Sequence, residues 1–136
     1  MDRIQATEVL CDSDDETHWA QWLWPHGGID LEQGYLVLER PADSEDEFAN
    51  RVWASRCGQS YSCYDGVEEV LLRRSAVEVK FNNRGKERLG CDDFCIEFSM
   101  PDAEFARLVE VLERLLTDCA EFVKPSEAGA ASDLGN

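Results

Sequence analysis

Residues 99–119 have the sequence SMPDAEFARLVEVLERLLTDC, and the spacing within this stretch decides the fold class. Its apolar residues recur at intervals of three or four, as in an amphipathic helix, and are Phe105, Leu108, Val109, Leu112, Leu115, Leu116 and Cys119. Pro101 suits the first turn of a helix, and Asp102 and Glu104 favour its positive end. We therefore predict one long helix from Pro101 to about Phe122.

Short apolar runs separated by turn signals precede this helix. The clearest is Ala76–Phe81, where apolar and charged residues alternate as in a half-buried strand. The other predicted strands are Ile4–Cys11, Tyr35–Arg40, Arg51–Cys57, Ser60–Tyr64, Val67–Arg74 and Asp93–Phe98. His18–Trp24 fits a strand better than a short helix, although both remain open. As a strand, it places Trp22 and Trp24 on one face and Trp19 on the other.

This order of elements predicts an α+β domain. We expect an antiparallel β-meander of about six to seven strands, with one long C-terminal helix packed on one face. The apolar stripe of the helix then covers the sheet, and a partner helix in a dimer is the alternative. We predict a single domain over residues 1–123 and a flexible tail, rich in Ser, Gly and Ala, over residues 124–136.

The charge of the chain restricts its partners. Its 136 residues include 29 acidic and 13 basic side chains, which gives a net charge of −16. Phosphate repels such a surface, so we expect no binding to nucleic acid or to an anionic membrane. No apolar run approaches the roughly 20 residues of a membrane-spanning helix, and the first residues lack the pattern of a signal peptide. We therefore expect a cytoplasmic protein whose partner is basic.

Much of the negative charge falls in two clusters, DSDDE at residues 12–16 and DSEDE at residues 43–47. They are either solvated loops that keep the protein soluble or a docking surface for a cationic partner. In the second case the charge accelerates association more than it strengthens the complex.

The sequence holds no recognisable metal site or catalytic motif. The six cysteines lack the two-residue spacing of a zinc knuckle, and the two histidines lie among the tryptophans, so we expect no metal or cofactor. No nucleophile elbow or phosphate-binding loop is present, and we expect no enzymatic activity. A small enzyme that pairs Cys63 or Cys95 with a histidine is the alternative in this class.

Aromatic residues are more numerous than a core of this size requires. They include Trp19, Trp22, Trp24, Trp53, Tyr61 and Tyr64, and such rings are enriched at the centres of protein interfaces. A position in the core is the expectation for Trp22 and Trp53. Tyr61 and Tyr64 lie three apart on a predicted strand, so they point to opposite faces and one of them should be exposed. The turn Asp65-Gly66 follows directly.

The chain resembles immunity protein family 10 of bacterial polymorphic toxin systems over about residues 35–116. The resemblance rests on Gly34–Arg40 followed by an acidic loop, on Ser60–Val70 with its Tyr-x-x-Tyr-x-Gly pattern, and on the strands and helix that follow. The family typically has a second glycine where this chain has Asp65. The resemblance implies a small cytoplasmic inhibitor, made beside a toxin, that blocks the toxin by binding it.

The residues and the resemblance lead to the same hypothesis, an immunity protein that neutralises a basic cognate toxin by direct binding. The candidate partner-binding residues are Asp43, Glu45, Asp46, Glu47, Tyr61, Tyr64, Asp65 and Trp24. An acidic secretion chaperone for an effector protein is the alternative. Such chaperones usually begin with a helix, whereas this chain is predicted to begin with a strand. The sequence leaves the oligomeric state open.

Overall fold

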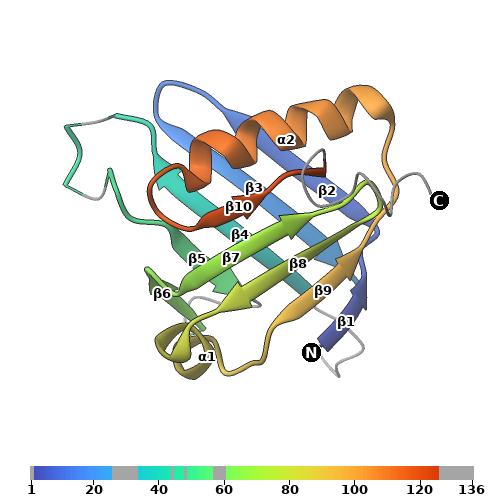
Figure 1. The fold of residues 1–136 in the computed structure, drawn as a ribbon, viewed down its shortest axis with the longest axis horizontal. Coiled ribbons are helices and arrows are strands. Elements are labelled where there is room, and N and C mark those ends of the chain that lie inside the picture. The colour runs from blue at the N-terminus through green and yellow to red at the C-terminus, as the bar shows by residue number, and fades with distance from the viewer. Residues whose placement is uncertain (1, 26–33, 44, 48, 57–60, 126–136) are drawn as a thin grey trace.

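Two five-stranded β-sheets face each other, and a helix lies along one side of the space between them (Figure 1). A computed structural model of the chain describes residues 2–25, 34–43, 45–47, 49–56 and 61–125. The first sheet has the order β1-β9-β8-β7-β10, with the bounds Asp2–Gln5, Phe94–Glu97, Ala76–Phe81, Val67–Leu72 and Glu121–Val123. The second has the order β2-β3-β4-β5-β6, with the bounds Glu8–Ser13, Thr17–Trp24, Gly34–Pro41, Trp53–Arg56 and Ser62–Tyr64.

The core lies between the two sheets. Apolar and polar residues alternate along the strands, so one face of each sheet is buried. Side chains with no exposed surface include Trp22, Leu36, Leu38, Val70, Leu72, Val77, Val79 and Ile96. Helix α2 (Asp102–Leu116) packs against β2 and β3 beside the first sheet, through Leu108, Val111, Leu112, Leu115 and Leu116. The amphipathic pattern of the helix is therefore satisfied within the chain.

The prediction of an α+β fold is confirmed, but the single meander is wrong. The predicted strand Ile4–Cys11 is divided at Ala6 and Thr7, where the chain passes from one sheet to the other. The Ala6 amide donates to the Glu97 carbonyl in the first sheet, and the Thr7 amide donates to the Leu23 carbonyl in the second, each at 2.8 Å. The sheets are also not wholly antiparallel, because β1 pairs with β9 and β10 pairs with β7 in parallel.

The prediction of one long helix to about Phe122 is also wrong. Helix α2 ends at Leu116, because the chain turns over the next residues, with Asp118 at φ 60°, and Phe122 enters β10. A second helix, α1, spans Asn83–Leu89. The Asn82 side chain accepts a hydrogen bond from the Gly85 amide at 2.8 Å and caps its first turn.

Segment His18–Trp24 lies in β3 and is a strand, as the aromatic pattern favours. Asp65, at the turn between β6 and β7, has φ 59°, in the left-handed region that favours glycine and is tolerated by Asp and Asn. This is the position at which the resembled family has its second glycine. Of the tail predicted at residues 124–136, only residues 124 and 125 fall in the described part, so the domain boundary stays a prediction.

Candidate functional site

The outer face of the second sheet carries a row of large side chains from four neighbouring strands. In the strand register Trp19 of β3 lies opposite Glu39 of β4, Glu39 lies opposite Trp53 of β5, and Trp53 lies opposite Tyr64 of β6. All four are half-buried, whereas the inner positions of the same strands are buried. These four residues form what is termed the outer row below. Directly opposed side chains touch across strands, so the row is a continuous surface of three rings and one carboxylate.

The rings at the β6 end of the outer row pack on each other. The centroids of Trp53 and Tyr64 are 4.8 Å apart, with the ring planes inclined at 57°. The next positions of the same face, Tyr35 and Val37, add further half-buried apolar surface. The face thus offers a rigid aromatic and aliphatic platform, of the kind found at interface centres.

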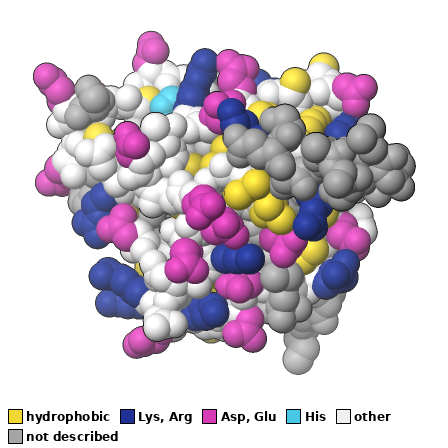
Figure 2. Space-filling model, in the orientation of Figure 1, with side chains coloured by type: hydrophobic (Ala, Val, Ile, Leu, Met, Phe, Trp, Pro, Cys, Tyr) yellow, Lys and Arg dark blue, Asp and Glu magenta, His cyan; other side chains and the backbone are white. Residues whose placement is uncertain are grey.

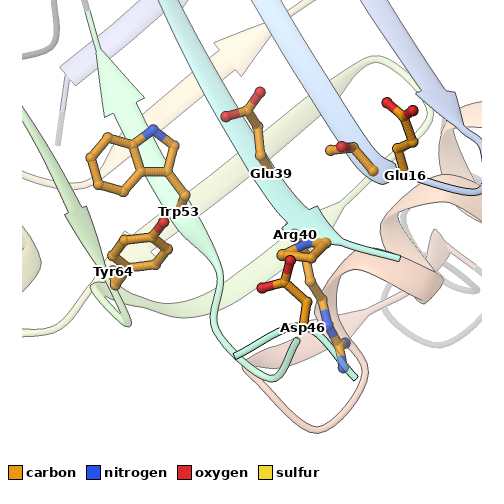
Figure 3. A pocket seen from close by; sticks show the side chains of 8 residues that line it. Glu16, Glu39, Arg40, Asp46, Trp53 and Tyr64 are labelled. Carbon is orange, nitrogen blue, oxygen red and sulfur yellow. The ribbon is translucent and has the colours of Figure 1, made fainter. Parts of the chain in front are cut away.

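Two adjoining hollows open over the outer row and share Thr17, Glu39 and Trp53. Figure 3 shows the hollow nearer the loops, where Glu16, Glu39 and Asp46 surround the opening and the rings of Trp53 and Tyr64 lie to one side. The three carboxylates come from the β2–β3 turn, from β4 and from the β4–β5 loop. The arrangement can hold positive charge against aromatic surface.

The two acidic clusters are brought together beside these hollows. Strands β3 and β4 form a hairpin in which Thr17 lies opposite Pro41, and the Ala42 amide donates to the Glu16 carbonyl at 2.9 Å. The acidic residues of 12–16 and 43–47 therefore meet at one end of the second sheet, and they are termed the acidic edge below. They are Asp12, Asp14, Asp15, Glu16, Asp43, Glu45, Asp46 and Glu47.

Backbone amides hold the carboxylates that shape the acidic edge. The Asp14 carboxylate accepts from the amides of Thr17 at 2.9 Å and Glu16 at 2.8 Å, and these bonds lower the pKa of Asp14. Asp43 accepts from the Glu45 amide at 2.9 Å in the same way. A hydrogen bond from the Ser13 amide, and then the contact with Arg107, lower the pKa of Asp12. Both turns are thus built around carboxylates that accept hydrogen bonds from backbone amides.

Arg40 anchors the β4–β5 loop and lines the same hollow as Glu39 and Asp46. Its Nε donates to the Ala49 carbonyl at 2.6 Å, and its terminal nitrogens donate to the carbonyl of Thr117 at 2.6 Å and to the side chain of Asn50 at 3.3 Å. The guanidinium therefore joins the loop to the end of α2. Its acceptors are neutral oxygens, so the guanidinium contributes one positive charge beside the carboxylates of the hollow that it lines.

The outer face of the first sheet has a different character. It carries ion pairs between oppositely charged side chains, Arg73 with Glu78 at 2.9 Å and Lys80 with Glu69 at 3.3 Å. Figure 2 views the molecule from this side and shows basic and acidic side chains interspersed over the surface. The acidic edge and the outer row, by contrast, both belong to the second sheet and the turns at its end.

The predicted partner-binding residues fall in three places. Asp43, Glu45, Asp46 and Glu47 are exposed on the acidic edge, and Tyr64 belongs to the outer row with Asp65 directly after it. Tyr61 is 45% exposed but lies apart from them, under the Arg56 guanidinium at 5.0 Å and close to Gly90. The expectation that one of the two tyrosines is exposed agrees with this placement.

Trp24 does not join this surface. It faces the core, is 9% exposed, and packs on Phe94 with the centroids 6.1 Å apart. The core position expected for Trp22 is confirmed, but the one expected for Trp53 is wrong, because Ala54 takes the inward position of β5. The missed members of the row, Trp19 and Glu39, were detectable as outward positions of β3 and β4.

The described part of the chain also bears on metal binding, membrane spanning and the protonation of the Cys63 thiol. Its His, Cys, Asp and Glu residues form no group of three or more suited to a metal ion, and none of its helices is long and apolar enough to span a membrane. Burial raises the pKa of the Cys63 thiol, which is 5% exposed and therefore stays protonated at neutral pH.

Comparison with known proteins identifies the family. A family model described as Immunity protein 10 matches residues 5–106, which is most of the chain. The chain therefore belongs to the immunity protein 10 family, and the resemblance seen in its sequence is confirmed. No curated protein and no solved structure matches the chain significantly. The family assigns a role in immunity against a toxin.

Proposed function

We propose that this protein acts in the cytoplasm as an immunity protein that binds its cognate toxin directly and performs no reaction of its own. Membership of the immunity protein 10 family supports the role against a toxin. The mode of action proposed is occupation of a basic surface on the toxin by the acidic edge and the outer row.

One observation carries the proposal, namely that the two acidic clusters meet next to the open aromatic row. The Ala42–Glu16 hydrogen bond holds the clusters together, and Glu16 and Asp46 line the same hollow as Glu39, Trp53 and Tyr64. Charge and apolar surface are therefore available to one partner at one place. Neither feature alone distinguishes a binding site from an ordinary solvated surface.

The proposed partner is a basic toxin domain. A toxin that acts on nucleic acid or its precursors needs a cationic cleft for phosphate, and a protein with net charge −16 is attracted to such a cleft. The carboxylates would guide the encounter, and the rings would supply the packed area that slows dissociation. The same negative charge opposes binding to nucleic acid or to an anionic membrane.

The experiment is to purify the protein with the toxin domain encoded beside it and to measure association and dissociation rates over a range of salt concentrations. We expect a tight complex, inactive toxin, and an association rate that falls as salt rises. Absence of a complex would refute the proposal. A complex whose association rate ignores ionic strength would refute its electrostatic part.

A further inference from the structure

Two arginine side chains of this protein each contact both an aromatic ring and a carboxylate of the same chain. Arg51 lies over the Tyr64 ring, 5.0 Å from its centroid, and its Nε is 2.8 Å from Asp65 Oδ2. Arg74 lies over the Phe105 ring at 4.6 Å, and one of its terminal nitrogens is 2.7 Å from Asp102 Oδ1. In both cases the ring face and the carboxylate satisfy one planar cation together.

The outer row also places aromatic rings beside a carboxylate at the end that contains Trp19. Glu39 is flanked in the strand register by Trp19 on one side and Trp53 on the other. These three side chains, with Tyr35 and Val37, line one hollow on the outer face. At the opposite end of the row, Tyr64 packs on Trp53 and is covered by the Arg51 guanidinium. The hollow lies at the Trp19 end.

The cation that would complete this arrangement does not come from the described chain. All 13 Lys and Arg residues lie in the described ranges, and none of them forms an ion pair with Glu39. The nearest in sequence, Arg40, points the other way along the strand and donates to the carbonyls of Ala49 and Thr117 (Figure 3). A carboxylate between two tryptophans is thus left for a group from outside.

We propose that Trp19, Glu39 and Trp53 form a receptor for one arginine side chain presented by the partner. The guanidinium would lie flat against an indole and donate two hydrogen bonds to the Glu39 carboxylate, as a planar fork can. Glu16 and Asp46, at the adjoining hollow, add negative potential around it, which Arg40 of the same hollow offsets in part. Arginine is favoured over lysine because a compact, strongly hydrated ammonium stacks less well on an indole.

This inference rests on the proposed function and makes it more specific. The acidic edge attracts any basic surface, whereas the receptor selects a particular side chain. It predicts that the toxin places an arginine at the centre of the interface, where such residues contribute most to affinity.

The test is an NMR titration of the ¹⁵N-labelled full chain with Nα-acetyl-arginine-methylamide, following the four tryptophan indole N–H signals. We expect the signals of Trp19 and Trp53 to shift, while those of the buried Trp22 and Trp24 serve as internal controls and stay in place. The citrulline analogue, which has the same shape without the charge, should cause no shift. The lysine analogue should bind more weakly than the arginine compound.

Variants separate the receptor from general attraction. Glu39→Gln keeps the shape of the side chain and should weaken arginine binding about tenfold, the range expected for a lost charge-assisted pair. Glu121→Gln removes the same charge from an exposed position on β10 of the first sheet and should leave binding unchanged. Trp53→Leu provides a second test on the ring and should also weaken binding.

Three results of the titration would overturn the receptor: indole signals that do not shift, the same arginine affinity in Glu39→Gln as in the wild type, or equal shifts with the citrulline analogue. A dimer in light scattering that dissociates in the Trp53→Leu variant would also overturn it, because a second copy would then cover the outer row. The proposed function is tested separately by toxin binding. If the toxin binds tightly and Glu39→Gln does not alter its affinity, the receptor is wrong and the immunity role stands. If the toxin does not bind, the immunity mechanism itself fails.

Discussion

The backbone amide of Ala42 donates a hydrogen bond to the carbonyl oxygen of Glu16, at 2.9 Å, where the β3–β4 hairpin ends. The hairpin thereby joins two acidic clusters that are separated in the sequence by the length of both strands. Like charges held in one region produce a stronger local field than the same charges spread over two loops. The electrostatic behaviour of the protein should therefore depend on this edge more than on its net charge.

Neutralising the β4–β5 loop tests this dependence. The combined changes Asp43→Asn, Glu45→Gln, Asp46→Asn and Glu47→Gln should reduce the rate of association with the toxin about tenfold at low salt, with a smaller effect on dissociation. The reason is that exposed charges guide the encounter, while packed contacts determine how long the complex lasts. Stopped-flow or surface-plasmon kinetics at several salt concentrations would measure both rates.

A matched control removes the same charge elsewhere. Glu68→Gln, Glu87→Gln, Glu104→Gln and Glu121→Gln change four exposed residues that form no ion pair within the described chain. This variant should associate at a rate close to that of the wild type. If both variants slow association equally, net charge alone is responsible and the acidic edge has no special role.

Two tryptophans on opposite faces of the second sheet, Trp22 of β3 and Trp53 of β5, should behave in opposite ways. Trp53→Ala removes a half-buried ring of the outer row and should weaken toxin binding by about 2 kcal/mol or more, mainly through faster dissociation, with a modest loss of stability. Trp22→Ala removes a side chain with no exposed surface and should lower the free energy of unfolding by about 3–5 kcal/mol. Calorimetric binding and urea unfolding of both variants would check this contrast. A Trp53→Ala protein with undiminished affinity would exclude the outer row from the interface.

The local sequence pattern predicts where the strands of this protein lie, but it does not predict which strands pair with each other. Alternation over residues 76–81 coincides with β8, because a strand buried on one face must alternate. The passage between sheets at Ala6 and Thr7 has no such local signal, since it depends on which distant carbonyls the two amides meet. The parallel pairing of β10 with β7 is likewise set by the tertiary fold. Hence an α+β domain was predictable, but the division into two sheets was not.

The candidate site shows the same division between local and long-range information. The acidic clusters and the number of rings are visible in the sequence, and from them Tyr64 is predicted as a candidate binding residue. The choice between Trp53 and Ala54 for the inward position depends on the register of β5 with β4, which no local pattern fixes. Trp24 is a different case, because alternation along the strand places it on the same face as Trp22, and both are buried.

The junction between α1 and the β6–β7 turn should be intolerant of a single methyl group. A Cβ on Gly85 would lie 2.3 Å from the Gly66 carbonyl oxygen, which is backbone and cannot turn aside. Alanine is the better helix former by about 1 kcal/mol, but the clash should outweigh that gain and lower the free energy of unfolding by about 1–3 kcal/mol. Urea unfolding of Gly85→Ala would measure the change, with the exposed Glu87→Ala in the same helix as control. A stabilised Gly85→Ala would show that the two glycines do not pack closely.

His18 should make the stability of the protein sensitive to pH. It is half-buried in β3, its Nδ1 contacts the Ser13 hydroxyl, and the neighbouring charges are Arg114 of α2, Arg40 of β4 and Asp14 of the turn. Burial, and then the two arginines, lower its pKa below the ordinary value of 6.5, and Asp14 opposes them only in part. The unfolded chain therefore binds a proton at this position more readily than the folded chain does.

It follows that the stabilising contribution of neutral His18 is complete above about pH 6.5 and is lost as the pH falls through this value towards the lower pKa of the folded state. Urea unfolding at about pH 7.5 and pH 5.5 should show a smaller free energy of unfolding at the lower pH, while ordinary carboxylates remain ionised at both. His18→Gln cannot bind the proton, so its free energy of unfolding should change less between the two pH values. An equal change in both proteins would place the pH dependence at another group, and a wild-type protein that gains stability at the lower pH would mean that the pKa of His18 is raised rather than lowered.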